Sequence, residues 1–156
     1  MLENLAEPTK PEELDEKVCA EIAALLKQNP LRENAVSESY RPIHWRRLAA
    51  RAILFLGRDE AGKLVAVGCM TVCLTLTNRI ARIGEVVIDK DSRNESTERD
   101  IFFRLTSWAG VMTDTISFEL DDRLCAVSEP ILKEAGFYHR HKSHHWRHII
   151  PSNENQ

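Results

Sequence analysis

The sequence has no hydrophobic run approaching the roughly 20 residues that a membrane-spanning helix needs. It also has no strong net charge: the formal charge is -3 at pH 7, so we do not expect the chain to bind nucleic acid. Residues 1–16 are acidic and mixed, unlike a signal or transit peptide. These absences predict a soluble, cytoplasmic protein with no membrane partner.

Cysteine pairs at metal-binding or redox spacing are also absent. None of the four cysteines, Cys19, Cys69, Cys73 and Cys125, belongs to a CxxC motif. All of them lie in apolar stretches, where a reduced cysteine packs as a small hydrophobic residue. We therefore expect neither a disulfide framework nor a cysteine-rich zinc site.

What is present is the ordinary composition of a globular protein. The chain has 156 residues, of which 43% are hydrophobic and 29% charged. This length suits a single domain, residues 1–156, with frayed ends at about 1–8 and 151–156.

Hydrophobic spacing predicts the order of the elements. Helical spacing covers residues 12–26 and 43–51, strands follow at 52–59, 65–76 and 79–89, and then come a helix from about 95, a strand at 115–120, a short helix at 131–136 and a last pair of strands about a turn near Ser143. Thr9 with Glu12, and Ser92 with Glu95, have the spacing of capping boxes, which predicts a helix start at each.

Glycine and connection length then set the topology. Gly62 is suited to a hairpin turn, so the first three strands, which follow one another directly, are expected to pair as an antiparallel meander. Gly136 is suited to the end of the short helix. A helix between the strands at 79–89 and 115–120 requires a crossover, and hence a parallel pair. The expected fold class is α/β (α+β), with a mixed, mostly antiparallel central sheet flanked by helices.

This order resembles the GNAT-type N-acetyltransferase superfamily, most closely over residues 52–137. Residues 85–109 are similar to the strand–loop–helix of the family, and residues 131–137 to its closing segment, which ends in Gly136-Phe137. The resemblance implies a GNAT-like acyl-CoA N-acyltransferase fold. It also implies an N-acetyltransferase that moves acetyl from acetyl-CoA to an amine of a small molecule or peptide.

The resemblance also implies where acetyl-CoA is held. In the family a splayed strand offers backbone groups to the pantetheine arm, and a loop at a helix N-terminus offers N–H groups to the pyrophosphate. The corresponding residues here are Val86, Val87, Ile88, Arg93, Asn94, Ser96 and Thr97.

Glu85, on the strand beside the cofactor, is the expected catalytic base. It lies in a mostly apolar run, where burial raises a carboxyl pKa toward the working range. The alternative is a strand-edge Glu85 paired with a surface arginine such as Arg82.

Three positions differ from the family pattern and leave a second hypothesis open. Ser96 and Glu98 stand where the loop usually has glycine, and Leu132 stands where many members have tyrosine. Glu98 brings a carboxylate toward the expected pyrophosphate, and like charges about 4–6 Å apart cost on the order of 1–4 kcal/mol. The alternative function is a catalytically inactive GNAT-like binding or regulatory protein that has lost acetyl-CoA.

Residues 138–150 contain no acid but carry five histidines, with Arg140, Lys142 and Arg147. Their spacing matches no recognised ligand set, so we expect no metal site. With Trp146 among them, these cations leave anion or nucleic-acid binding as a weaker alternative. A polar hairpin at 139–148 discourages strand-to-strand association, although this hairpin and the strand at 65–76 also offer surfaces for a homodimer.

Overall fold

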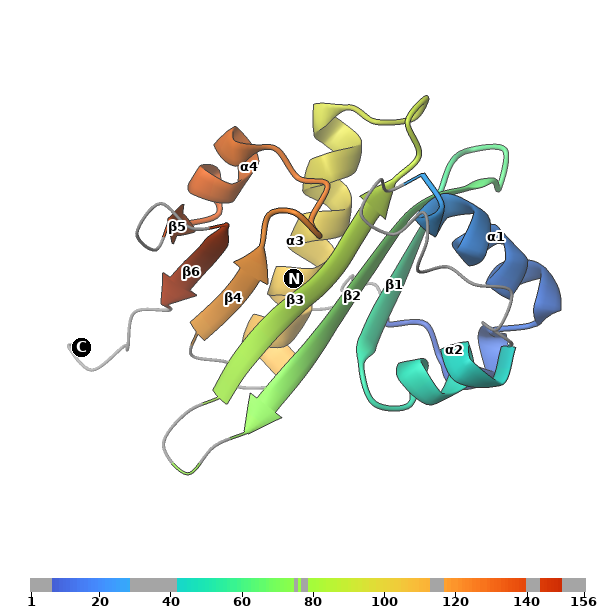
Figure 1. The fold of residues 1–156 in the computed structure, drawn as a ribbon, viewed down its shortest axis with the longest axis horizontal. Coiled ribbons are helices and arrows are strands. Elements are labelled where there is room, and N and C mark those ends of the chain that lie inside the picture. Colours follow the sequence, from blue (N-terminus) through green and yellow to red (C-terminus); the bar gives the residue numbers. More distant parts are fainter. Residues whose placement is uncertain are drawn as a thin grey trace.

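The computed structural model describes residues 7–28, 42–74, 76, 79–112, 117–139 and 144–149. The strands that it describes form one sheet in the order β1-β2-β3-β4-β6-β5, with helices against it (Figure 1). The expected frayed ends, apart from residues 7–8, lie outside the described residues, as do His141 and the turn near Ser143.

The element bounds follow the hydrophobic spacing closely. The strands are β1 (Ile53–Arg58), β2 (Leu64–Leu74), β3 (Arg79–Ile88), β4 (Ser117–Asp121), β5 (Tyr138–His139) and β6 (His145–Ile149). The helices are the 3-10 turn η1 (Pro11–Glu13), α1 (Glu16–Leu26), α2 (Pro42–Ala49), α3 (Glu95–Met112) and α4 (Glu129–Glu134). Within the described ranges, no helix combines the length and apolarity needed to cross a membrane.

The pairing of the strands confirms the expected fold class. Strands β1, β2 and β3 form an antiparallel meander, and β3 pairs with β4 in parallel across the crossover helix α3. Strand β6 is antiparallel to both β4 and β5. Gly62 has a φ of 80° in the turn between β1 and β2, as the sequence predicts.

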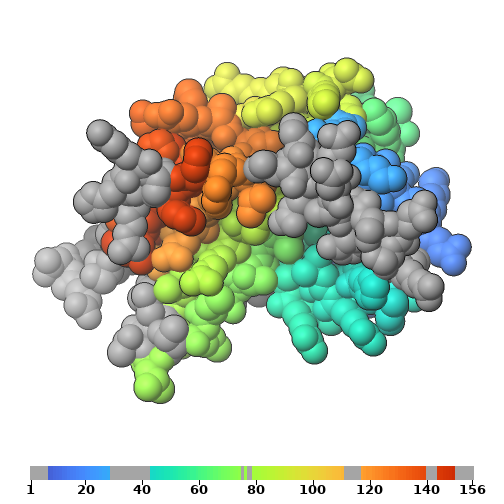
Figure 2. Space-filling model, viewed as in Figure 1, coloured from blue at the N-terminus to red at the C-terminus, as the bar shows by residue number. Residues whose placement is uncertain are grey.

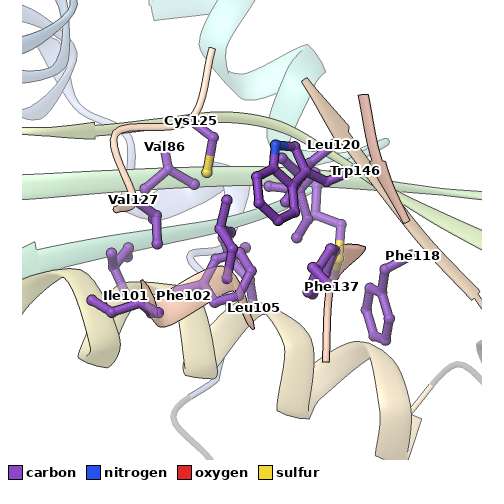
Figure 3. Close-up of a cluster of buried hydrophobic side chains, with 14 of the residues drawn as sticks. Val86, Ile101, Phe102, Leu105, Phe118, Leu120, Cys125, Val127, Phe137 and Trp146 are labelled. Carbon is purple, nitrogen blue, oxygen red and sulfur yellow. The ribbon is translucent and has the colours of Figure 1, made fainter. Parts of the chain in front are cut away.

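Alternation along the strands divides the core into two layers. On one face of the sheet Val86, with Ala66 of β2 and Leu120 of β4, packs against α3 and α4. On the other face Val87, with Val67 of β2 and Leu54 of β1, packs against α1 and α2. Figure 3 shows the first layer, where Phe102 and Leu105 of α3 meet Val86 and Phe137 beneath the sheet. The residues of β3 therefore face alternate layers, and its remaining free edge lies toward β4.

The N-terminal helix begins later than expected. Thr9 does not cap it: its backbone N–H donates to the carbonyl of Leu54 on β1 at 2.7 Å. Asp15 caps α1 instead, since its Oδ1 accepts the N–H of Val18 at 2.8 Å. The capping box predicted at Thr9–Glu12 is wrong because the chain first makes the separate turn η1, whose own cap is Lys10.

An Asp15→Ala variant is expected to lose about 1 kcal/mol of folding free energy, because the N–H of Val18 loses its acceptor. Urea unfolding followed by circular dichroism measures this loss. Thr9→Ala is the control, with an expected change within about 0.5 kcal/mol. Equal losses in the two variants would contradict the assignment of the cap.

Candidate active site

Strands β3 and β4 run side by side for a short distance and then part. Their parallel pairing covers residues 80–83 of β3 and 117–120 of β4. Just beyond it the register between β2 and β3 shifts, which leaves Gly84 as an extra residue on β3. The ladder between β3 and β4 ends at this bulge, so the strands open toward the C-terminal end of β3.

The chain after β4 returns to β3 once more, at Val86. The Val86 N–H donates to the carbonyl of Leu124 at 3.0 Å, and the Ala126 N–H donates to the carbonyl of Val86 at 2.7 Å. This bridge, which aligns Cys125 with Val86, closes the inner end of the opening. The backbone of Val86, one of the predicted cofactor contacts, is thus engaged by the chain itself.

Outward from this bridge the opening continues as a hollow of about 480 Å³. Its lining comes from the end of α1, from β3 with the loop that follows it, and from the turn after β4: Gln28, Val87, Ile88, Lys90, Arg93, Asp122, Arg123, Cys125, Ala126 and Val127. Figure 2 shows these segments on one face of the molecule, in blue, yellow-green and orange.

Ile88 directs unused backbone groups toward this hollow. It lies two residues beyond Val86, so its N–H and C=O point to the same side as those of Val86, away from β2. The next residue, Asp89, points the other way, since its N–H donates to the carbonyl of Val65 on β2 at 2.8 Å. No hydrogen bond within the described part of the chain uses either group of Ile88. This predicted contact therefore offers both a donor and an acceptor.

The cations that line the hollow differ in how they are already paired. Arg123 Nε lies 2.9 Å from Asp121 Oδ1, and this hydrogen bond lowers the pKa of Asp121 to about 2. Arg93 Nε lies 2.8 Å from Glu98 Oε1. The ammonium of Lys90 has no carboxylate partner among the described residues. Lys90 is therefore the lining cation most available to an anionic ligand.

Glu98 is buried in the first turn of α3, with 6% of its surface exposed. Its carboxylate accepts hydrogen bonds from Arg93 Nε and from the backbone N–H of Ser128, each at 2.8 Å. Burial raises the pKa of Glu98, but the bonds from Arg93 and Ser128 outweigh it, and the net shift is downward. The charge expected to repel a pyrophosphate is thus directed at a guanidinium and an amide of the chain itself.

The start of α3 is capped by Asn94, so the capping box predicted at Ser92–Glu95 is wrong. Asn94 Oδ1 accepts the N–H of Thr97 at 3.0 Å. The hydroxyl of Ser92 donates instead to the buried carboxylate of Asp89, at 3.1 Å. Ser92 is drawn away from the helix because that carboxylate needs donors, which the sequence spacing does not reveal.

The predicted cofactor contacts fall into two groups. Arg93 and the strand residues beyond Val86 line the first hollow. Asn94, Ser96 and Thr97 line a second hollow of about 330 Å³, between the start of α3 and strands β1 and β2. The two hollows have no lining residue in common.

Glu85 is half-buried on β3, opposite Cys69 on β2, and it lines neither hollow. Burial, followed by the negative charge of Glu85, raises the pKa of the Cys69 thiol to about 11. Arg82 Nε, the arginine proposed as an alternative partner, lies 3.5 Å from a carboxylate oxygen of Glu119. The role of Glu85 as the base stays a prediction.

The closing segment ends α4 in a Schellman motif. The N–H of Phe137 donates to the carbonyl of Leu132 at 2.9 Å, and the N–H of Gly136 to that of Lys133 at 3.0 Å. Gly136 has a φ of 89°, so the helix stop predicted there is confirmed. Leu132 is 1% exposed and packs in the core, where it offers a packing group and no phenol.

The histidines near the C-terminus have different environments. His148 is a packing residue: its ring stacks on Phe118 with centroids 6.0 Å apart, and its Nδ1 lies 2.9 Å from the carbonyl oxygen of Gly136. Among the described residues, no group of three or more His, Cys, Asp or Glu side chains is arranged to hold a metal ion.

Asp122, directly after β4, lies beside the rings of His139, His144 and Trp146. Its carboxylate accepts Trp146 Nε1 at 3.1 Å, lies 2.8 Å from His144 Nδ1 and is 3.6 Å from His139 Nε2. Burial raises the pKa of Asp122, but the hydrogen bonds from Trp146 and His144 lower it, and the net shift is downward. Asp122 is a functional candidate that the sequence pattern alone did not reveal. The available signal was an acid at the end of one strand facing a histidine-rich strand predicted beside it.

No family model matches the sequence, and no curated protein matches it. Solved structures do match. An acetyltransferase of the GNAT family from Streptococcus pneumoniae has a TM-score of 0.62 at 15% identity, over 93% of this chain and 98% of that one. A chain of the NatC complex bound to Gag peptide and CoA has a TM-score of 0.65 at 10% identity, over 93% and 97%. A chimera of spermidine N-acetyltransferase SpeG from Vibrio cholerae and hSSAT has a TM-score of 0.64 at 11% identity, over 87% and 93%.

Identities this low establish the fold alone, yet the likeness extends over most of each chain compared. In this chain the matched span includes the antiparallel meander, the parallel β3–β4 pair and the crossover helix between them. This chain has the acyl-CoA N-acyltransferase fold of the GNAT-type N-acetyltransferase superfamily.

Proposed function

We propose that this protein is an N-acetyltransferase that uses acetyl-CoA as the acetyl donor and an amine of a small molecule or peptide as the acceptor. The observation that carries this proposal is the hollow outside the Val86 bridge. There the unused backbone groups of Ile88 and the side chains of Lys90 and Arg93 line one opening of about 480 Å³.

The lining fits the chemistry of acetyl-CoA in two respects. The pantetheine arm carries amides, which suit the unused N–H and C=O of Ile88 at a strand edge. The phosphates carry negative charge, which suits Lys90 and the guanidinium of Arg93. When bound, acetyl-CoA supplies an activated acetyl group, and the residues of this chain hold and orient it. A ligand that reaches further in than Ile88 must displace the bridge at Val86.

The acceptor class follows from what the structural neighbours bind. The NatC structure holds a peptide, and SpeG is a spermidine N-acetyltransferase. These are properties of those proteins, and they support an amine acceptor here at the level of chemical class. Glu85 remains the predicted base from the sequence, and the cytoplasmic location and the homodimer remain part of the proposal.

Acetyl-CoA is expected to raise the melting temperature of the protein, because a ligand that binds only the native state stabilises it by mass action. Lys90→Ala is expected to weaken binding about fivefold to tenfold, since it removes the lining cation that has no acid partner in the described part of the chain. Differential scanning fluorimetry and isothermal titration calorimetry measure the two effects.

Lys133→Ala is the matched control, because Lys133 is an exposed cation on α4 that pairs with Glu129 and does not line the hollow. Binding by this variant should equal that of the wild type. No thermal shift at millimolar acetyl-CoA would reject the proposal in favour of the inactive binding or regulatory protein. If both lysine variants lost the same affinity for acetyl-CoA, the protein would still bind the cofactor, but not in this hollow.

A further inference from the structure

Asp122 lines the hollow and joins it to a cluster with His144 and Trp146, whose contacts acetyl-CoA binding does not explain. From its geometry we infer that Asp122 and His144 act as one unit that accepts the proton of the acceptor amine. The inference rests on the proposed function, because an ammonium must lose a proton before its nitrogen can attack an acetyl group.

Asp122 lines the hollow and is held in place by neighbouring groups. Its carboxyl group is the only one among the described residues that line the hollow. Trp146 Nε1, which can only donate, holds one carboxylate oxygen from a buried ring. The backbone N–H of Asp122 donates to the carbonyl of His144 at 2.9 Å, so the residue is fixed from two sides.

His144 is held in the tautomer that leaves a basic nitrogen free. An ionised carboxylate only accepts hydrogen bonds, so the Nδ1 that lies 2.8 Å from Asp122 Oδ1 carries the hydrogen. The lone pair then resides on Nε2. Carboxylates orient catalytic histidines in the same way in hydrolases that use a Ser-His-Asp triad. The side chain of His144 is 60% exposed, which allows its proton to exchange with water.

Titratable and charged groups lie on the elements around this pair. They are Asp121 and Arg123 from the turn after β4, Glu129 with Lys133 from α4, His139 from β5, His145 from β6, and Arg93 and Lys90 across the hollow. Arg123 and Lys133 are each paired with an acid, at Asp121 and Glu129 respectively. The lowered pKa of Asp122 keeps the carboxylate ionised, so the proton of the unit resides on the ring.

The proton balance of acetyl transfer requires such a group. A new N–C bond forms while the C–S bond breaks, and the ammonium of the acceptor releases two protons in total. One proton remains on the thiol product. The unit takes the other and passes it to solvent through His144 Nε2.

The pairing is tested first without any cofactor. Nitrogen-15 NMR of the imidazoles should show His144 with its hydrogen on Nδ1 in the wild-type protein. In Asp122→Asn, which retains an oxygen for Trp146, the tautomer should move toward the Nε2–H form. His145→Gln, the neighbouring histidine, is the control and should leave the His144 signals in place. If the tautomer of His144 stayed the same in Asp122→Asn, Asp122 would not set it, and the proposed unit of the two residues would be wrong.

The role in proton transfer is tested by the pH dependence of kcat/KM, with acetyl-CoA and either spermidine or a short peptide with a free N-terminus. The wild type should show an acidic limb, in which kcat/KM falls as the proton acceptor becomes protonated. His144→Gln should lose this limb, and its kcat/KM should fall by about 10²–10⁴-fold. Loss of the limb in Glu85→Gln, and not in His144→Gln, would overturn the inference and leave Glu85 as the base. Absence of turnover in the wild type would instead reject the proposed function.

Discussion

A Gly136→Ala variant is expected to lose about 2–4 kcal/mol of folding free energy, because two costs fall on one residue. The φ of 89° lies in the left-handed region, where an L side chain costs about 1–2 kcal/mol. The new Cβ would also lie 2.7 Å from Cε1 of His148, a ring held by stacking on Phe118 and by its contact with the Gly136 carbonyl. Thermal or urea unfolding measures the loss.

Gly62→Ala separates the two costs. Gly62 has a φ of 80°, but nothing lies within 4 Å of the Cβ that alanine would add. This variant should lose only the backbone part, about 1–2 kcal/mol. If both variants lost the same amount, His148 would not be a rigid neighbour, and the packing role assigned to it would be wrong.

Local patterns were enough to predict the fold. The apolar run of β2 is buried on both faces through Met70, as a central strand requires, and helix α3 between β3 and β4 imposes their parallel pairing. The same reasoning failed at helix starts, because several polar residues within a few positions competed to be the cap. Asn94 caps α3 while the Ser92 hydroxyl donates to Asp89. Asp15 caps α1 because the separate turn η1 lies between Thr9 and that helix.

The candidate site was harder to predict, because its contacts join residues that are distant in the sequence. Arg93 and Ile88 were predicted as cofactor contacts from the resemblance of the strand–loop–helix, and the structure places both in the lining of the hollow. The bridge from Val86 to the turn after β4 depends on how that turn returns to the sheet, and no local pattern encodes it. Asp122 and His144 meet for the same reason, since β4 and β6 become neighbours only in the assembled sheet.

Glu98 is where stability and cofactor binding are expected to oppose each other. Glu98→Ala removes the acceptor of the Ser128 N–H and of Arg93 Nε. The backbone N–H of Ser128, left without an acceptor, should lower the free energy of unfolding by about 1–3 kcal/mol. Arg93 adds little to this loss, because its side chain is 47% exposed and can turn to solvent. Glu95→Gln, an exposed acid in the same turn, is the control and should change stability by less than about 0.5 kcal/mol.

The acid dependence of this loss has a definite sign. The pKa of Glu98 is lower in the folded protein than its ordinary value, so its stabilisation is complete above the unfolded pKa of about 4.3. It is lost as the pH falls through the folded pKa. The gap in unfolding free energy between wild type and Glu98→Gln should therefore narrow below about pH 4. A gap that stays constant down to acid unfolding would mean that the carboxylate is not the stabilising form.

Binding of acetyl-CoA should move in the opposite direction. Glu98→Gln removes a negative charge beside the hollow and releases Arg93 from its ion pair, so affinity should rise by about fivefold, which corresponds to about 1 kcal/mol. Calorimetric titration of the variant against the wild type measures the change. An unchanged affinity would mean that Arg93 already neutralises the charge that a phosphate would meet. A lower affinity would mean that the bond from Glu98 to Ser128 holds the wall of the hollow in place, and that the carboxylate serves the site by fixing its shape.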